Sequence, residues 1–201
     1  MYPAGRYDIL AKWKRQHEYF TPLPKPTRRM ANTTVRSRRN SAWKSFSIWS
    51  NPNNPMNLNK DLREFVELLN SRKIKYVLVG GHAVAYHGFP RFTGDVDFFI
   101  DTSPDNAALV AAAVGDFGFA NLGLKEADFR GPETVVQLGR APHRIDILTS
   151  VTAVSFAEAW ETRVATTLDG LPVWVISKDL LVRNKLATGR PQDLADAKRI
   201  G

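Results

Sequence analysis

Four residues near the middle of the chain have types and spacings that suit phosphate and metal chemistry. Gly80 and Gly81 follow a run of four apolar residues, and Asp95 lies fourteen residues beyond the second glycine, with Asp97 two residues later. Because alternate side chains of a β-strand share a face, we expect the carboxylates of Asp95 and Asp97 to project together. A cation between them would relieve their repulsion, and oxygen ligands of this kind suit Mg²⁺ or Mn²⁺.

The glycine pair is the second half of this pattern. Gly80 and Gly81 are predicted to end a strand and to open a short helix over residues 82–87, which would present backbone N–H groups to an anion. His82 follows the glycines directly, so its imidazole is placed to contact a phosphate or a base. A Gly-Gly pair alone is often only a tight turn. Combined with the carboxylate pair, it predicts a site for a nucleoside triphosphate (NTP).

The segment resembles the signature of the polymerase-beta nucleotidyltransferase superfamily in its Gly80-Gly81 pair and in Arg91, Thr93, Asp95 and Asp97. Within that superfamily it is similar to the toxin-type nucleotidyltransferases of the AbiEii and MenT groups, and the resemblance covers about residues 58–200. Many superfamily members have Gly-Ser at the turn, whereas the second position here is Gly81, so a serine hydroxyl for a phosphate oxygen is missing.

The resemblance implies an α/β (α+β) fold, with a mixed β-sheet flanked by helices. It also implies metal-dependent transfer of a nucleoside monophosphate (NMP) from an NTP to an acceptor hydroxyl. In the toxin-type branch the implied acceptor is RNA, notably tRNA ends, or protein, and the implied partner is an antitoxin. Other relatives modify antibiotics. A competing function class is a non-catalytic nucleic-acid-binding protein. The mutually repelling carboxylates of Asp95, Asp97 and Asp146 argue against this alternative.

A third carboxylate is available on a second alternating run, residues 143–148, where Arg144 and Asp146 share one predicted strand face. The resemblance implies that Asp146 completes the metal site with Asp95 and Asp97 and helps to deprotonate the acceptor. These three residues are the predicted catalytic and metal ligands. The predicted nucleotide-binding residues are Gly80, Gly81, His82, Arg91, Thr93 and Lys185.

Two of these nucleotide contacts are cations from other parts of the sequence. Arg91 could hold a phosphate or brace the carboxylates of Asp95 and Asp97. Lys185 lies in a C-terminal segment that resembles the family pattern, on a predicted helix from which it could reach over the sheet to a triphosphate. The alternative for this segment is a solvated face on which Asp193 and Asp196 are helix-end charges of small energetic worth. A zinc site is not expected, since no His-Glu-x-x-His motif or cysteine accompanies the histidines.

The composition fits one catalytic domain over residues 56–201, with 43% hydrophobic and 24% charged residues. The sequence contains no run of about 18 apolar residues, so no membrane span is expected. The absence of cysteine excludes disulfides and thiolate metal sites and fits a cytoplasmic protein. The predicted elements alternate between helices and strands. The helices begin near Asn59, Gly81, Pro104, Phe156, Ser177 and Pro191, and the later strands form two hairpins, 134–138 with 143–148 and 165–168 with 173–176.

The positive charge of the chain belongs to its first 55 residues, which carry 11 basic against 2 acidic residues. This segment is rich in proline and without periodicity, and we predict a disordered extension. Its basic and aromatic residues suit a nucleic-acid-binding arm. Met56 is also a natural start, so residues 1–55 could instead be a misassigned extension, and an organelle transit segment is a minor option.

Overall fold

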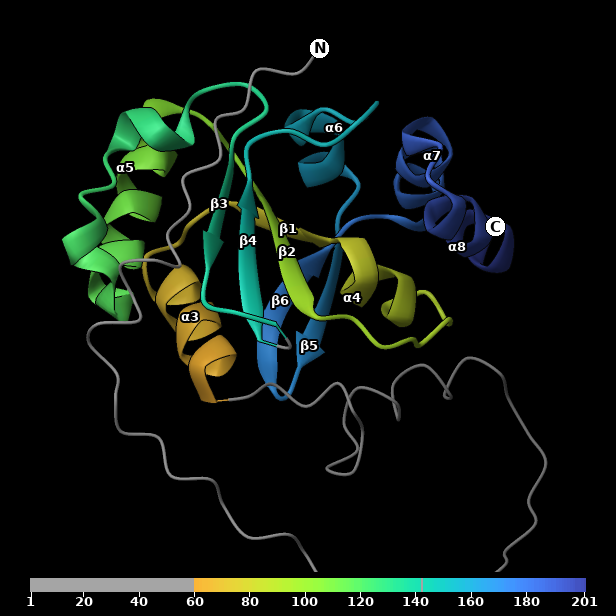
Figure 1. Cartoon of the computed structure of the whole chain (residues 1–201), viewed down its shortest axis with the longest axis horizontal. Helices are drawn as coiled ribbons and strands as arrows, with labels where there is room; N and C mark the ends of the chain where they lie inside the picture. Colours follow the sequence, from red (N-terminus) through yellow and green to blue (C-terminus); the bar gives the residue numbers. More distant parts are fainter. Residues whose placement is uncertain (1–59, 142) are drawn as a thin grey trace, which may run out of the picture.

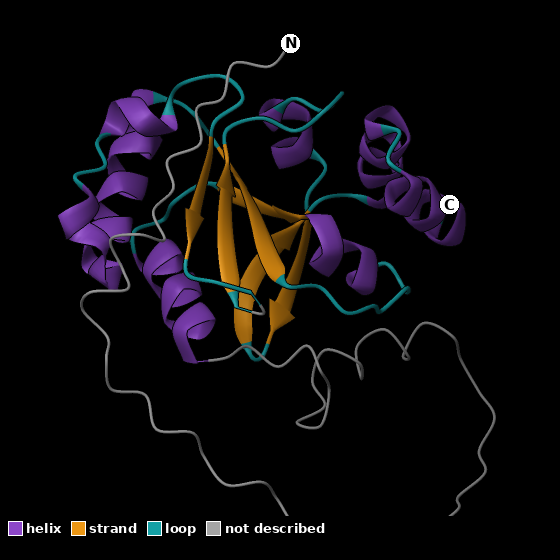
Figure 2. Cartoon of the chain, in the orientation of Figure 1, coloured by secondary structure: helices purple, strands orange, loops and turns teal. Residues whose placement is uncertain are grey.

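The structure is a computed structural model that describes residues 60–141 and 143–201. The predicted extension over residues 1–55 and the predicted helix cap at Asn59 lie outside the described residues. In the described part, a six-stranded mixed sheet lies between helices (Figures 1 and 2). This confirms the predicted fold class. No helix in this part of the chain has the length and apolar character needed to cross a membrane.

The strands are β1 (Tyr76–Val79), β2 (Asp95–Ile100), β3 (Val135–Leu138), β4 (Arg144–Leu148), β5 (Val164–Leu168) and β6 (Leu171–Val175). The helices are α3 (Lys60–Ser71), α4 (Gly80–Tyr86), α5 (Pro104–Val114), α6 (Phe156–Glu161), α7 (Lys178–Thr188) and α8 (Pro191–Ile200). Three short helical turns, Gly115–Phe119, Ala120–Leu122 and Glu126–Phe129, connect α5 to β3 and were not predicted. The other elements begin and end within two residues of the predicted bounds.

The strand order is β3-β4-β2-β1-β6-β5. Both predicted hairpins are confirmed, since β3 pairs with β4 and β5 with β6 in antiparallel fashion. The central strands combine both senses: β1 is antiparallel to β2, while β2 is parallel to β4 and β1 is parallel to β6. As a result β2 and β4, the two strands that carry the predicted carboxylates, are direct neighbours in the middle of the sheet.

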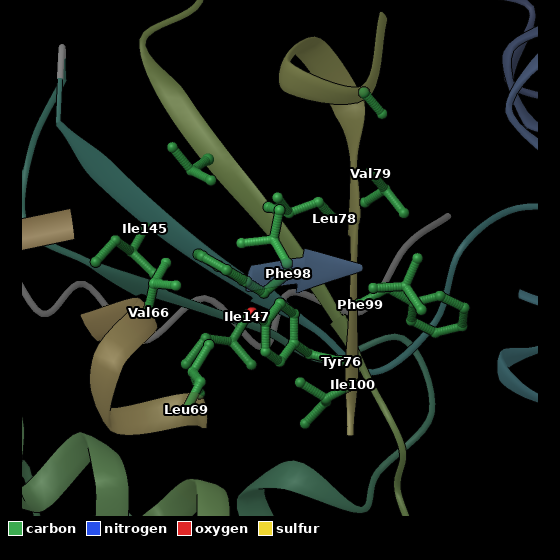
Figure 3. Close-up of a cluster of buried hydrophobic side chains, with 14 of the residues drawn as sticks. Val66, Leu69, Tyr76, Leu78, Val79, Phe98, Phe99, Ile100, Ile145 and Ile147 are labelled. Atoms are coloured by element: carbon green, nitrogen blue, oxygen red, sulfur yellow. The ribbon is translucent and has the colours of Figure 1, made fainter. Parts of the chain in front are cut away.

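One face of the sheet is covered by α3, whose apolar residues recur at helical spacing. Leu62, Phe65, Val66 and Leu69 are all buried. The Phe65 ring packs edge-on against Phe98 of β2, with ring centroids 5.5 Å apart. Figure 3 shows this part of the core, in which Val66 and Leu69 of α3 lie to one side of Phe98 and its neighbours in the sheet. Burial of each such side chain contributes about 1.5–3 kcal/mol, which anchors β2 in the sheet.

The opposite face carries the residues of odd number in β2. Phe99 packs edge-on against Phe156 of α6, with centroids 5.2 Å apart, so α6 covers this face. Asp95 and Asp97 belong to the same alternation and therefore emerge here. In Figure 1, α4, α6, α7 and α8 lie to the right of the sheet, and α3 and α5 lie to its left. The carboxylates thus project on the side of α4, α6 and the C-terminal helices.

Candidate active site

The three predicted carboxylates meet on one face of two adjacent strands. In the parallel pairing of β2 and β4, Asp95 lies opposite Arg144 and Asp97 lies opposite Asp146. The intervening Val96 is 4% exposed and faces the core, as the alternation predicts. The predicted shared face of Asp95 and Asp97 and the predicted position of Asp146 on a neighbouring strand are therefore both confirmed by the register.

Asp146 is buried, with 5% of its surface exposed, and its charge is compensated by direct hydrogen bonds. Arg144 donates from Nε to Oδ1 at 2.6 Å and from Nη2 to Oδ2 at 2.9 Å. Gln137, its partner across the β3–β4 pairing, donates to Oδ2 at 3.2 Å. A buried carboxylate without such partners would be costly, so these donors stabilise Asp146 in a fixed orientation.

Asp95 is held from two sides. The Thr93 hydroxyl donates to its Oδ1 at 2.8 Å, and the Nη2 of Arg144 forms an ion pair with its Oδ2. Arg144 therefore bridges Asp95 and Asp146. Sequence reasoning placed Arg144 on the face of Asp146 but gave neither it nor Gln137 a role. Strand pairing is the signal that could have identified these roles, since Arg144 lies opposite Asp95 and Gln137 lies opposite Asp146.

The carboxylate of Asp97 lies in a less compensated setting. Burial and, to a smaller extent, the negative charges of Asp95 and Asp146 raise its pKa to about 7, against an opposing effect of Lys185 and Arg144. The negative charge at this point of the sheet is thus in excess of the positive charge around it. Three carboxylates on one face, with one guanidinium between two of them, form a donor set that fits a hard divalent cation such as Mg²⁺ or Mn²⁺.

The donor types fit a metal, but their arrangement is not that of an assembled metal centre. Among the residues that the structure describes, no group of three or more His, Cys, Asp or Glu side chains is gathered closely enough to hold an ion. The hydrogen bonds give the reason, because Asp95 and Asp146 are both turned to the guanidinium of Arg144. Coordination by all three carboxylates would require this bridge to change.

The glycine pair makes room for the carboxylate motif. Gly80 has a φ of +61°, and a Cβ at this position would lie 1.9 Å from Oδ2 of Asp97. A Cβ at Gly81 would lie 2.7 Å from the Thr93 hydroxyl. The space that a serine would need at position 81 is therefore filled by Thr93, which accounts for the departure from the Gly-Ser pattern.

The same glycines begin α4, two residues earlier than the predicted helix over residues 82–87. The N–H groups of the first turn of a helix point back along its axis and have no intrahelical acceptor. They face the end of β1, where Val79 pairs with Asp97 of β2. The start of α4 and the carboxylates are thus adjacent, as a combined phosphate and metal site requires.

His82 has a different setting from the predicted one. Its imidazole is 9% exposed and hydrogen-bonds to the backbone of Asp95, and burial lowers its pKa to about 4. It is therefore neutral at physiological pH, and its Nδ1 has no hydrogen-bond partner in the described structure. The enclosed ring braces the start of β2 against α4, and its contact with a phosphate or base stays a prediction.

Lys185 also differs from its prediction. It is 4% exposed, and its Nζ forms ion pairs with Asp193 and, at 3.5 Å, with Asp196. It does not reach freely over the sheet, although its charge is close enough to Asp97 to lower that residue's pKa. For Asp193 and Asp196 the alternative of a solvated helix face is wrong, although Asp193 does form an i,i+3 pair with Arg190. They are 3% and 0% exposed, so they are buried counter-ions and not solvated helix-end charges.

Arg91 is the second cation that the structure assigns elsewhere. Its guanidinium donates to the carboxylate of Asp196 from Nε at 3.1 Å and from Nη2 at 2.9 Å. It therefore braces a carboxylate of α8 and not Asp95 or Asp97. This pair ties the loop between α4 and β2 to the C-terminal helices, and through Asp196 it joins Arg91 to Lys185.

The sheet, the start of α4 beside it and the facing carboxylates have the arrangement that the resemblance to nucleotidyltransferases implies. The comparison with protein families agrees. The chain belongs to the family described as "nucleotidyltransferase of unknown function" (DUF6036), whose model matches residues 56–200. It is therefore a transferase of nucleotidyl groups. A search of curated proteins found no match.

The raised pKa of Asp97 predicts how the metal-free protein responds to pH. The folded state keeps this proton up to about pH 7, whereas the unfolded state releases it near the ordinary aspartate pKa of 3.8. Between these values the folded state binds more protons, so its stability falls as pH rises. Asp97→Asn removes this contribution. We expect the variant to gain stability over the wild type from pH 4 to pH 7, by up to a few kcal/mol.

Urea unfolding of both proteins in the presence of a chelator, at several pH values across this window, measures the effect. The comparison of Asp97→Asn with wild type cancels the other titrating groups, and Asp116→Asn on the exposed surface serves as the control. A stability difference that does not change with pH would show that Asp97 titrates normally.

Proposed function

We propose that the protein transfers NMP from an NTP to an acceptor hydroxyl and releases pyrophosphate, with Mg²⁺ or Mn²⁺ held by Asp95, Asp97 and Asp146. The observation that carries this proposal is the register of β2 and β4, which brings the three carboxylates to one face beside the start of α4. Family membership supports the reaction class, and the excess negative charge around Asp97 supports the metal.

Each residue has a separate part in this proposal. When bound, a divalent cation neutralises triphosphate charge and lowers the pKa of the acceptor hydroxyl. Asp146, fixed by Arg144 and Gln137, is the third ligand or the base that receives the acceptor proton. Thr93 orients Asp95 through its hydrogen bond to Oδ1. Because Gly80 has no side chain, it leaves space for the Asp97 carboxylate.

The phosphates would bind at the glycine turn. The N–H groups at the start of α4 would donate to phosphate oxygens. Lys185 and Arg91 would support this phosphate-binding turn indirectly. Their charges are committed to Asp193 and Asp196, so they support the site mainly by fixing α7 and α8 against it.

For the acceptor we propose RNA, notably tRNA ends, with protein hydroxyls as the second class, following the resemblance to toxin-type nucleotidyltransferases. A toxin of this kind would be neutralised by an antitoxin partner and would act in a toxin–antitoxin or phage-defence system. An antibiotic is the third class of acceptor that the superfamily resemblance implies, and it belongs in the same assay.

The test is transfer of label from each of the four NTPs, in Mg²⁺ or Mn²⁺, to total RNA, to a protein extract or to an aminoglycoside. We expect the wild type to label one acceptor class and Asp95→Ala/Asp97→Ala to lose at least about 100-fold in rate, since two ligands are removed. Asp116→Ala, which removes an exposed carboxylate far from the sheet face, is the matched control and should retain the activity. Equal labelling by the double variant, or no labelling of any acceptor, would contradict the proposal.

A further inference from the structure

Arg144 occupies an unusual position for a side chain in a site proposed to bind metal. Its guanidinium reaches two carboxylates from one strand position, Asp146 two residues along β4 and Asp95 directly across the strand pair. The contact with Asp146 uses both Nε and Nη2, and the same Nη2 also meets Asp95. A positive charge thus already lies between two of the three proposed ligands.

The hydrogen bonds that Asp95 and Asp146 accept show which contacts a metal ion would have to displace. Oδ1 of Asp95 accepts from Thr93 and its Oδ2 from Arg144. Oδ1 of Asp146 accepts from Arg144, and its Oδ2 accepts from Arg144 and Gln137. All four oxygens are therefore engaged, three of them by a charged donor. A guanidinium stays protonated under all physiological conditions, so this charge can be moved but not titrated away.

We propose that Arg144 is the resident countercharge of the carboxylate face: it holds Asp95 and Asp146 together in the metal-free protein and gives up Asp95 to a divalent cation. This inference rests on the proposed function, because it assumes that a metal binds there. Arg144 is a positioning residue in this account. It fixes the orientation of Asp146 through Nε, and it makes free metal bind weakly because displacing the guanidinium from Asp95 uses part of the binding energy.

Two opposite effects of removing Arg144 follow. In the metal-free protein, loss of the guanidinium leaves Asp95 and Asp146 facing each other without a counter-ion, which lowers stability. In metal binding, the same loss removes the competitor, so affinity rises. A residue that merely stabilised the fold would show the first effect without the second.

The experiment is a calorimetric titration of Mn²⁺ into the metal-free full chain at about pH 8. It compares wild type with Arg144→Gln, with Arg144→Lys, and with Arg183→Gln, whose exposed ion pair with Glu158 lies apart from the carboxylates. We expect Arg144→Gln to bind Mn²⁺ about tenfold more tightly, the lysine variant to fall between, and Arg183→Gln to match wild type. In thermal melts, Arg144→Gln should melt below wild type in a chelator and gain more from saturating Mn²⁺ than wild type gains.

Unchanged or weaker Mn²⁺ binding by Arg144→Gln, with normal binding by wild type, would overturn this inference and leave the proposed function standing. If the glutamine variant does not fold, the lysine variant decides, since it keeps the charge but lacks the planar fork of donors with which Arg144 holds the two carboxylates. Tighter binding by Arg144→Lys than by wild type supports the inference, and equal or weaker binding overturns it. No Mn²⁺ binding by any of the proteins would overturn both the inference and the proposed metal dependence.

Discussion

Asp146→Asn is expected to lower nucleotidyl transfer by a factor of about 10² or more while NTP binding persists, which is the size of effect that loss of a general base produces. The amide keeps the shape of the side chain and one acceptor oxygen, but it removes the negative charge that faces Arg144. Asp95 and Asp97 remain to seat a metal–nucleotide complex. Single-turnover transfer and equilibrium NTP binding, measured on the same preparation, separate the two effects.

Asp101 and Asp128 are the controls for this prediction, since they are the next acidic residues in the chain that could supply a third carboxylate. In the structure Asp101 accepts hydrogen bonds from the backbone and hydroxyl of Ser103, and Asp128 accepts from the backbone of Lys125. Both serve local turns, so Asp101→Asn and Asp128→Asn should leave the rate of transfer near that of wild type. Wild-type transfer by Asp146→Asn would show that the proposed role of this strand is wrong.

Lys185→Met is expected to destabilise the folded protein by about 3–5 kcal/mol, the usual cost of breaking a buried ion pair by removing one partner. The methionine fills a similar volume, but Asp193 and Asp196 are left buried without the lysine charge. Arg91 and Arg190 compensate them only in part. Urea unfolding at neutral pH measures the loss, and Lys198→Met, at an exposed position of α8, is the matched control.

This experiment also separates two roles for Lys185. If the residue mainly supports the fold, stability falls and the protein that remains folded binds NTP with near wild-type affinity. A variant with unchanged stability but weakened NTP binding would favour the direct phosphate contact that the sequence predicts. Measuring both quantities on one variant is necessary, because the lysine is buried and yet close enough to affect the pKa of Asp97.

The sequence by itself determined the local geometry of the fold and of the carboxylate motif. The two-residue period of a strand fixes that Asp95 and Asp97 share a face and that Val96 is buried. The glycine at a positive φ in Asp169-Gly170 fixes a tight hairpin, and apolar spacing fixes the buried face of α3. The helical turns between Gly115 and Phe129 escaped prediction because so short a segment shows no clear period.

Only the tertiary structure decided which cation meets which carboxylate. Arg91 and Asp196 are 105 residues apart, and Arg144 and Asp95 are 49 apart, so no local period relates them. The sequence shows that Arg91 and Lys185 are positive, but a charge is attracted by every carboxylate within reach. The choice among them depends on the order of the strands and on the packing of α7 and α8, which bury Asp193 and Asp196 and so make the nearest cations their obligatory partners.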